Sequence, residues 1–495
     1  MSDQLADNTL GGDPPTVPEG EIAHEIPWKH VPPVTYRDLP EPLPLRKVIG
    51  PSVLLLAGAI GSGEFVLWPY ITSQVGLALV WLVVIGITTQ YFLNMEIERY
   101  TLATGETAVV GFTRLWKPWG WLFIAMTVIP WMWPGWATGG TTTLSFATGF
   151  DADKIPFITI GVLIVIGLVL TLSPVVYKTV EKIQFFLVAF IILFVLYAAI
   201  VLIGGEGYKG LAMGFVEIQK LPAAIAEVPA ALLLGAIAFA GAGGAMNLVQ
   251  SNWVRDKGLG MGALLPKVVS PFTGEEVVQP TTGYFFKRDE ENMRKWKAWW
   301  KVADKEQTIT FLVIGGITLL VFMALTFVTL GTGGEAASFD FIKLEGEALR
   351  ELQGPWLSTF FWVAGSAVLY STNLTILDMV GRLAADVLKT TTLRDSNISE
   401  SRLYFIFVWT MILFGSIILL SGVDQPLLLI VIASSLNGLV MFVYSVLLLR
   451  LNRSVLPREI GLKGFRFGAI IWACLFYGGF SAFLLFDQGS KLFGG

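Results

Sequence analysis

Long apolar runs without charged residues alternate with short polar segments along the chain. The first run extends from Val48 to Met95, and Glu64 is its only charged residue in 48 positions. An α-helix needs about 20 residues to cross a bilayer, so this run predicts two spans with a turn near Pro69 and Gly76. Nine further runs raise the expected number of spans to eleven: Pro118–Phe150, Ile155–Tyr177, Ile183–Gly205, Val228–Val254, Gln307–Gly334, Leu352–Leu377, Leu403–Val423, Gln425–Leu449 and Phe467–Phe486.

The composition is that of a polytopic membrane protein. Hydrophobic residues make up 54% of the chain and charged residues only 15%, far from the averages of soluble domains. Cys474 is the single cysteine, and His24 and His30 are the only histidines and precede the first span. These counts exclude a disulfide framework, a thiolate metal site and a histidine ligand within the membrane.

The spans suggest four parts of the chain. Residues 1–45 hold nine of the 24 prolines and are expected to form a flexible cytoplasmic tail. Residues 46–205 and 206–454 are expected to form two five-helix repeats, and residues 465–487 an extra C-terminal transmembrane helix. The loop 255–306 lies within the second repeat, and its stretch from Lys287 to Lys305 predicts an amphipathic helix lying on the membrane surface.

The distribution of basic residues predicts the orientation. With a cytoplasmic N-terminus, only six of the 34 lysines and arginines lie outside: Lys154, Lys209, Lys220, Lys343, Arg350 and Lys491. Positively charged loops favour the cytoplasmic side. We therefore expect an integral protein of the plasma (inner) membrane, with its N-terminus inside and its C-terminus outside.

Glu64 is the most informative residue of the first span. A carboxylate at mid-span is expensive in lipid and usually faces a cavity or a partner. The preceding glycines and Ser62 are poor helix formers, so a local break is expected at Gly61–Ser62–Gly63. The alternative is a glycine-rich packing face, with Glu64 reaching towards an interface.

The sixth span carries a similar interruption. Gly235-Ala236-Ile237 precedes a glycine cluster there, as Gly58-Ala59-Ile60 does in the first span. The two spans begin halves with an odd number of helices, which must then be inverted relative to one another. Broken helices in matching positions of inverted repeats are the sequence indicator of a transporter with its site between the breaks.

The order of several short motifs resembles the Nramp family of divalent-metal transporters, which have the LeuT-type fold. The similarity runs from about Gly50 to Arg453 and rests on five segments: Gly50-Pro51, Gln90 with Arg99 to Glu106, Lys178 to Glu181, Ser371-Thr372-Asn373 through Leu383, and Ser434 to Asn437. The resemblance implies an all-α LeuT-type 5+5 inverted repeat with about eleven transmembrane helices, of which helices 1 and 6 are broken.

The chain departs from that family at the chemistry of the site. The family's Asp-Pro-Gly-Asn becomes Gly61-Ser62-Gly63-Glu64, and its Met-Pro-His is replaced by Gly244-Ala245-Met246-Asn247. The third span carries no carboxylate and is rich in aromatic residues instead. Trp131, Trp133 and Trp136 are the candidate aromatic lining of the site.

These residues predict a substrate site made of oxygen ligands. The candidate substrate-binding residues share a place near the breaks or on the facing eighth and tenth spans: Gly61, Ser62, Glu64, Gly244, Met246, Asn247, Gln250, Asn373 and Asn437. Glu64 and Asn247 are the candidate metal ligands. An all-oxygen site suits Mg²⁺ or Mn²⁺, so we expect a secondary-active transporter or symporter of a hard divalent cation.

Alternatives remain open at this point. One carboxylate also suits a small organic cation or an amino acid, because tryptophans attract ammonium groups through cation–π interactions. A non-transporting sensor with the same fold is a further alternative. An enzyme is not expected, because the spans lack a catalytic histidine or paired carboxylates. No cofactor besides a transported cation is expected, and the expected partners are the substrate and membrane lipid, not nucleic acid.

Overall fold

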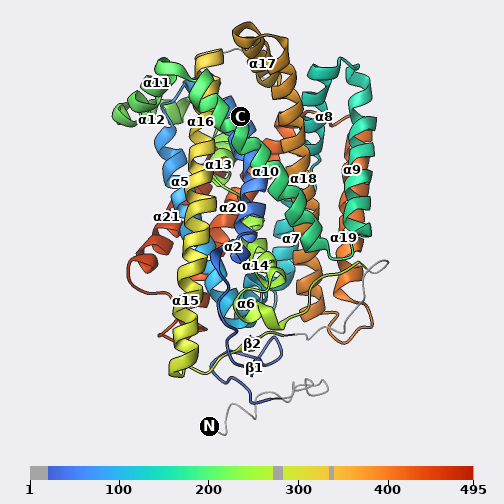
Figure 1. The fold of residues 1–495 in the computed structure, drawn as a ribbon, viewed down its shortest axis with the longest axis vertical. Helices are drawn as coiled ribbons and strands as arrows, with labels where there is room; N and C mark the ends of the chain where they lie inside the picture. Colours follow the sequence, from blue (N-terminus) through green and yellow to red (C-terminus); the bar gives the residue numbers. More distant parts are fainter. Residues whose placement is uncertain (1–19, 271–281, 334–338, 494–495) are drawn as a thin grey trace.

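The computed structural model describes residues 20–270, 282–333 and 339–493. Within these residues, nine helices are long and apolar enough to cross a membrane (Figure 1). They are α3–η1–α4 (Pro51–Ala59, Ile60–Leu67, Trp68–Val75), α5 (Val80–Thr104), η2–α9 (Ala152–Lys154, Ile155–Leu172), α10–η3 (Val176–Tyr197, Ala198–Leu202), α15–η6–α16 (Glu290–Gln307, Thr308–Ile314, Gly315–Leu330), α18 (Pro355–Thr390), α19 (Glu400–Leu420), α20 (Pro426–Ser454) and α21 (Gly464–Phe493).

The predicted third and sixth spans are each divided into two shorter helices. The third consists of α7 (Trp119–Trp131) and α8 (Gly135–Thr148), and the sixth of α13 (Ala230–Ala238) and α14 (Ala245–Lys257). The break predicted in helix 6 is therefore confirmed. The exact number of spans and their division into repeats at 46–205 and 206–454 stay predictions.

The break predicted in helix 1 is wrong. Residues Ile60–Leu67 form a π-helix, η1, that joins α3 to α4 without unwinding, and the Trp68 N–H bonds to the Gly63 carbonyl five residues earlier. A wider helical turn keeps the backbone groups bonded, whereas an unwound segment inside a membrane protein needs other partners. The glycines thus widen the helix instead of interrupting it.

Burial separates central helices from peripheral ones. The apolar window of α3–η1–α4 is 100% buried, whereas only 28% of the windows of α9 and α10 is buried. The peripheral helices expose large apolar side chains, such as Phe186 at 72% and Ile200 at 80%. Apolar surface of this kind is stable against acyl chains and not against water, so the chain is an integral membrane protein with Glu64 in its central helix.

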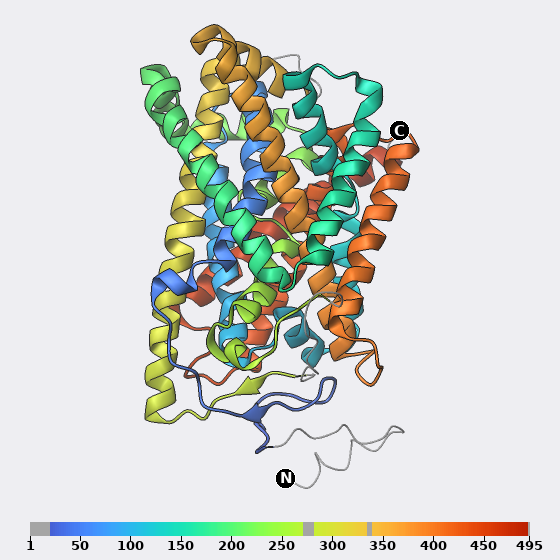
Figure 2. The same cartoon turned by 45° about the vertical axis from the view of Figure 1, so that its right-hand side comes forward.

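Short elements cover the two ends of the bundle (Figure 1). At the end away from the N-terminus lie α11 (Gly204–Val216), η4 (Ile218–Lys220), α12 (Leu221–Glu227) and α17 (Asp340–Gln353). At the end near the N-terminus lie α2 (Leu45–Val48), α6 (Ala108–Leu115), η5 (Gly260–Leu264) and the parallel strands β1 (Thr35–Tyr36) and β2 (Tyr284–Phe285). The two termini lie towards opposite ends of the bundle (Figure 2).

The tail predicted to be flexible is packed from Gly20 onwards. Residues 20–44, here called the strap, bury Ile26, Val34 and Leu39. The Arg114 guanidinium donates to the carbonyls of Pro27 at 2.7 Å and Pro32 at 2.9 Å. Proline-rich segments lack backbone donors, so side chains from the bundle supply the hydrogen bonds instead. Residues 1–19 of the predicted tail lie outside the described residues.

The amphipathic helix predicted on the membrane surface also has a different position. α15 continues through η6 into α16 as one helix of 41 residues, Glu290–Leu330, and extends along the bundle axis (Figure 1). Its tryptophans pack inward, and Trp299 donates to the Pro40 carbonyl at 2.8 Å. The strap thus covers the apolar face of α15, which is expected from the sequence to contact lipid. Residues 271–281 of the predicted loop lie outside the described residues.

Replacing Arg114 by alanine should destabilise the protein and release the strap. Arg114 pairs with buried Glu106, so its loss leaves an uncompensated buried carboxylate, which typically costs about 3–5 kcal/mol. Thermal unfolding and limited proteolysis within the strap measure the two effects. Arg294→Ala is the control, because its ion pair with Glu41 is more than 60% exposed on both sides and contributes little. Equal proteolysis of the Arg114 variant and wild type would contradict the role given to Arg114.

Glu345 in α17 should make stability depend on pH. Burial raises its pKa to about 8, although Thr326 donates a hydrogen bond to it. The stability that its protonation contributes is complete below pH 4.5, the pKa of an ordinary glutamate, and is lost as the pH rises from there through about 8. Glu345→Gln should therefore flatten the fall in melting temperature between pH 5 and pH 9. An unchanged fall in the variant would assign the pH dependence to other groups.

Candidate functional site

The glycines of the first span bring its backbone close to three neighbouring helices. η1 packs against α13, α16 and α18. A Cβ placed on Gly58 would lie 2.1 Å from the Met246 Sδ, and one on Gly63 would lie 1.6 Å from the Phe239 carbonyl oxygen. Gly61 is similarly close to the Thr372 hydroxyl. The packing face considered as the alternative from the sequence is therefore present, and it directs η1 against the break in helix 6.

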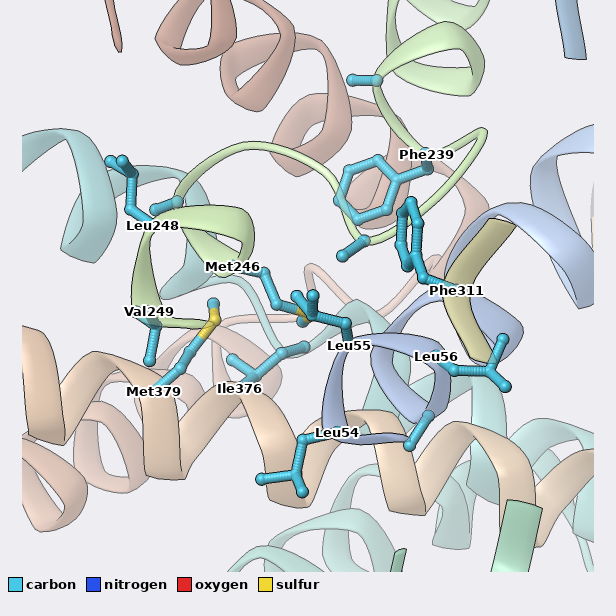
Figure 3. Packing of buried hydrophobic residues seen from close by; sticks show 14 of the residues in the cluster. Leu54, Leu55, Leu56, Phe239, Met246, Leu248, Val249, Phe311, Ile376 and Met379 are labelled. Carbon is cyan, nitrogen blue, oxygen red and sulfur yellow. The ribbon is translucent and has the colours of Figure 1, made fainter. Parts of the chain in front are cut away.

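The break in helix 6 spans the residues between Ala238 and Ala245. Gly243 and Gly244 have positive φ angles of 79° and 54°, which side chains with a Cβ rarely adopt. Figure 3 shows Phe239 where α13 ends and Met246 where α14 begins. The chain is thus interrupted beside the glycine-lined face of η1.

Two side chains from neighbouring helices bond the backbone groups that this break releases. The Gln90 amide donates to the Ala238 carbonyl at 2.7 Å and accepts from the Gly243 N–H at 3.3 Å. The Asn437 Oδ1 accepts from the Ala245 N–H at 3.2 Å. These bonds satisfy polar groups that lipid cannot, so Asn437, which the sequence names as a candidate substrate-binding residue, bonds the backbone at the break.

Glu64 lies on η1 and is completely buried. A Cβ on Gly315 of α16 would be 3.8 Å from its Oε1, so the carboxylate faces α16. The Thr318 hydroxyl lies nearby, but it donates to the Gly315 carbonyl at 2.9 Å. Among the described residues, neither carboxylate oxygen has a hydrogen-bond partner. A buried carboxylate without a partner is strongly unfavourable as an anion, so this position is suited to bind a proton or a cation.

Aromatic rings occupy the other side of the junction. Trp131 and Trp136 stack with their ring centroids 5.1 Å apart, and Phe239 lies 5.5 Å from Trp131. The Trp136 indole donates to the Ser62 hydroxyl at 2.8 Å. The indole N–H groups of Trp131 and Trp133 have no partner among the described residues. The structure therefore brings Trp136, Ser62 and the break together as the sequence predicts.

The predicted amide ligands are bonded elsewhere and do not join Glu64. The Asn247 amide donates to Asn94 at 2.6 Å and to Gln90 at 3.3 Å. The Gln250 amide donates to Glu98 at 3.4 Å, and Asn373 on α18 is buried with its amide nitrogen unbonded. Because the amides of Asn247 and Gln250 turn towards α5 and Glu64 faces α16, this conformation does not assemble the proposed ligand set.

The described residues contain no group of three or more histidine, cysteine, aspartate or glutamate side chains arranged to hold a metal. A divalent cation at Glu64 would therefore depend on neutral oxygens and retained waters, as Mg²⁺ does at sparse sites. Such a cation is a substrate rather than a resident cofactor.

Sequence reasoning left Gln90, Asn94 and Glu98 out of the site. They lie four residues apart on α5, so they share one helix face, and the structure turns that face towards α14. Their four-residue spacing, which places three polar side chains on one face of a membrane span, was the available signal.

Asp378 and Arg382 lie four residues apart on α18 and form a buried ion pair. The Arg382 Nε donates to both Asp378 oxygens at 2.8 and 2.9 Å, and Arg382 also pairs with Asp256 of α14. Because each of these side chains is fully buried, the pair ties α18 to α14 and serves the structure.

Comparisons with known proteins place the fold. No protein-family profile matches the sequence, and no curated protein matches it either. The structure is similar to a manganese transporter from Eremococcus coleocola, seen as its mutant H236A, with a TM-score of 0.64, 13% identity and coverage of 92% of this chain and 91% of the other. It is also similar to Mhp1, a nucleobase-cation-symport-1 family transporter, with a TM-score of 0.52, 14% identity and coverage of 90% and 95%.

Both solved structures are transporters rather than enzymes. At this level of identity the similarity concerns the fold and not the substrate. The chain is a membrane protein with the LeuT-type fold, as its resemblance to the Nramp family implies.

Proposed function

We propose that the protein is a secondary-active transporter that moves a hard divalent cation, such as Mn²⁺ or Mg²⁺, by alternating access. The observation that carries the proposal is the buried carboxylate of Glu64, which no described residue bonds, on the helix that packs against the break in helix 6. Intramembrane carboxylates usually mark ion pathways. A manganese transporter from Eremococcus coleocola has a similar fold, so the fold is compatible with a divalent cation as the substrate.

Transport requires the Glu64 carboxylate to exchange its surroundings. In the present conformation Glu64 faces α16, while the amides of Asn247 and Gln250 face α5. A movement of η1 relative to α14 would bring oxygen ligands from both helices to one cation. At Gly58, Gly61 and Gly63 no side chain projects from helix 1 towards its neighbours, so no side chain at these three positions obstructs such a movement.

A small organic cation is the second candidate substrate. The stacked Trp131 and Trp136 rings lie beside Phe239 at the break, and the indole N–H groups of Trp131 and Trp133 are free to donate within the described part of the chain. Aromatic faces attract ammonium groups, by up to roughly 2 kcal/mol when water is excluded. Mhp1, which shares the fold, was solved with bromovinylhydantoin bound.

Glu64→Gln should abolish uptake of the divalent cation without unfolding the protein. Glutamine has nearly the same shape, and its lack of charge removes the unfavourable buried anion. Uptake of Mn²⁺ and Mg²⁺ into liposomes, with melting temperature measured in parallel, tests both statements. Glu345→Gln is the matched control, because Glu345 is also a buried glutamate but lies in α17 and not beside the break in helix 6. Uptake by this variant should remain normal.

The same liposomes distinguish the alternatives. Uptake of organic amines or amino acids without metal uptake would replace the divalent cation by the second candidate. Binding of a substrate without flux in any gradient would favour a sensor. Metal uptake that is equal in Glu64→Gln and wild type would remove Glu64 from the mechanism.

Gly63→Ala should reduce both stability and uptake, because the new methyl group would collide with the Phe239 carbonyl. Overpacking of this kind typically costs about 1–3 kcal/mol. Gly316→Ala is the control, since a Cβ there meets nothing within 4 Å and alanine favours a helix over glycine. Melting temperatures and initial uptake rates of both variants provide the comparison; a normal Gly63→Ala protein would show that this contact is dispensable.

A further inference from the structure

A cleft of about 510 Å³ opens beside the first turns of α10. It is bounded by Ile49 before α3, by α10 and by Lys257 at the end of α14, and its polar lining consists of Lys178, Lys182, Lys257 and Glu181. Phe185 and Phe186 form part of its apolar wall. The cleft lies far from the carboxylate of Glu64 along the chain, and the proposed transport mechanism does not use it.

The cleft has an excess of positive charge. Lys257 pairs with Glu181, whose Oε1 also accepts a hydrogen bond from Tyr177 at 3.1 Å. No ion pair within the described part of the chain involves Lys178 or Lys182. Among the lining residues, three lysines face one carboxylate. Lys178 and Lys182 belong to flexible side chains that can reach a common anion.

The apolar wall faces the lipid. Phe185 is 57% exposed and Phe186 72% exposed, and Leu193 farther along α10 and Ile200 in η3 are exposed as well. Residues 178 and 186 are separated by about 12 Å along a helix that rises about 1.5 Å per residue. The cleft therefore presents two ammonium groups one turn apart, with aromatic rings one to two turns farther along α10 in the apolar layer.

We propose that this cleft binds an anionic phospholipid of the leaflet at the N-terminal end of the bundle. The phosphate would lie between Lys178 and Lys182, and an acyl chain would cover Phe185 and Phe186. Basic pockets between helices near the cytoplasmic surface are typical sites for acidic headgroups. A free phosphate would leave the aromatic wall uncovered, so the chemistry fits a lipid better than a soluble anion.

The bound lipid would lie where three helices meet. The Lys257–Glu181 pair joins α14 to α10, and a Cβ on Gly50, which begins α3, would collide with the Glu181 Oε1. A phosphate held by Lys178 and Lys182 would lie on the same turns of α10 as Glu181, which makes this contact. We therefore expect lipid binding to stabilise the packing of α3, α10 and α14 against one another.

Native mass spectrometry of the delipidated, full-length protein tests the proposal with dioleoyl phosphatidylglycerol and dioleoyl phosphatidylcholine. We expect phosphatidylglycerol to bind more tightly, and the Lys178→Gln/Lys182→Gln double variant to lose at least about fivefold of that affinity, because each lysine near a membrane surface contributes appreciably to the attraction of acidic lipid. The Lys178→Arg/Lys182→Arg double variant keeps both charges and should bind as wild type does.

Lys209→Gln is the matched control. Lys209 lines a cleft of similar size, about 500 Å³, at the opposite end of the bundle, where two lysines face two glutamates. Equal binding of the two lipids by wild type, or full binding by the glutamine double variant, would overturn the proposal. A rise in melting temperature with inorganic phosphate as large as that with phosphatidylglycerol would overturn the lipid as the source of the anion. Each result is independent of whether the protein transports a metal.

Discussion

The interruption of helix 6 depends on hydrogen bonds supplied by other helices. Gln90 of α5 bonds the carbonyl of Ala238 and the N–H of Gly243, and Asn437 of α20 bonds the N–H of Ala245. Neither water nor lipid can bond these backbone groups inside the bundle, so the break would be unstable without the bonds from Gln90 and Asn437. The two amides thus fix α5 and α20 on either side of the break, and the closely packed η1 completes its surroundings. The Glu64 carboxylate owes its position to this arrangement.

The two ends of the bundle are closed in different ways. At the N-terminal end, buried ion pairs of Arg255 and Arg382 connect α14 to α18 and α19, and Arg114 of α6 pairs with buried Glu106. Removing one member of such a pair is costly because the other remains buried and charged. The strap lies against this charged region and bonds to Arg114. At the other end, α17 covers the bundle with an apolar face and one buried carboxylate, Glu345. The N-terminal end is therefore held mainly by charge, and the opposite end mainly by packing.

Much of the fold could be predicted from the sequence because membrane spans are determined by length and polarity alone. The apolar runs located the helices, and the glycines located the break in helix 6. The sequence could not distinguish a wide helix from an unwound one at Gly61–Gly63, since both suit glycine and differ only in backbone hydrogen bonds. It also could not show the strap, because residues 20–44 have no periodic pattern and pack through proline carbonyls. Glu64 could be identified because it is the only charged residue of a long apolar run. The residues that surround it could not, because they depend on how each helix is rotated about its axis, and one charged residue does not determine that rotation.

The unbroken helix from Glu290 to Leu330 has a mechanical consequence. With about 1.5 Å per residue, its 41 residues extend roughly 60 Å, about twice the hydrocarbon thickness. Half of this rod lies outside the bilayer, where Asn292 and Trp299 bond to the backbone of Leu39 and Pro40. A tilt of α16 beside Glu64 would therefore displace the Glu290 end of the helix by a larger distance than the residues near Glu64. The helix that contacts the buried carboxylate is thus rigidly connected to the segment that covers the N-terminal end.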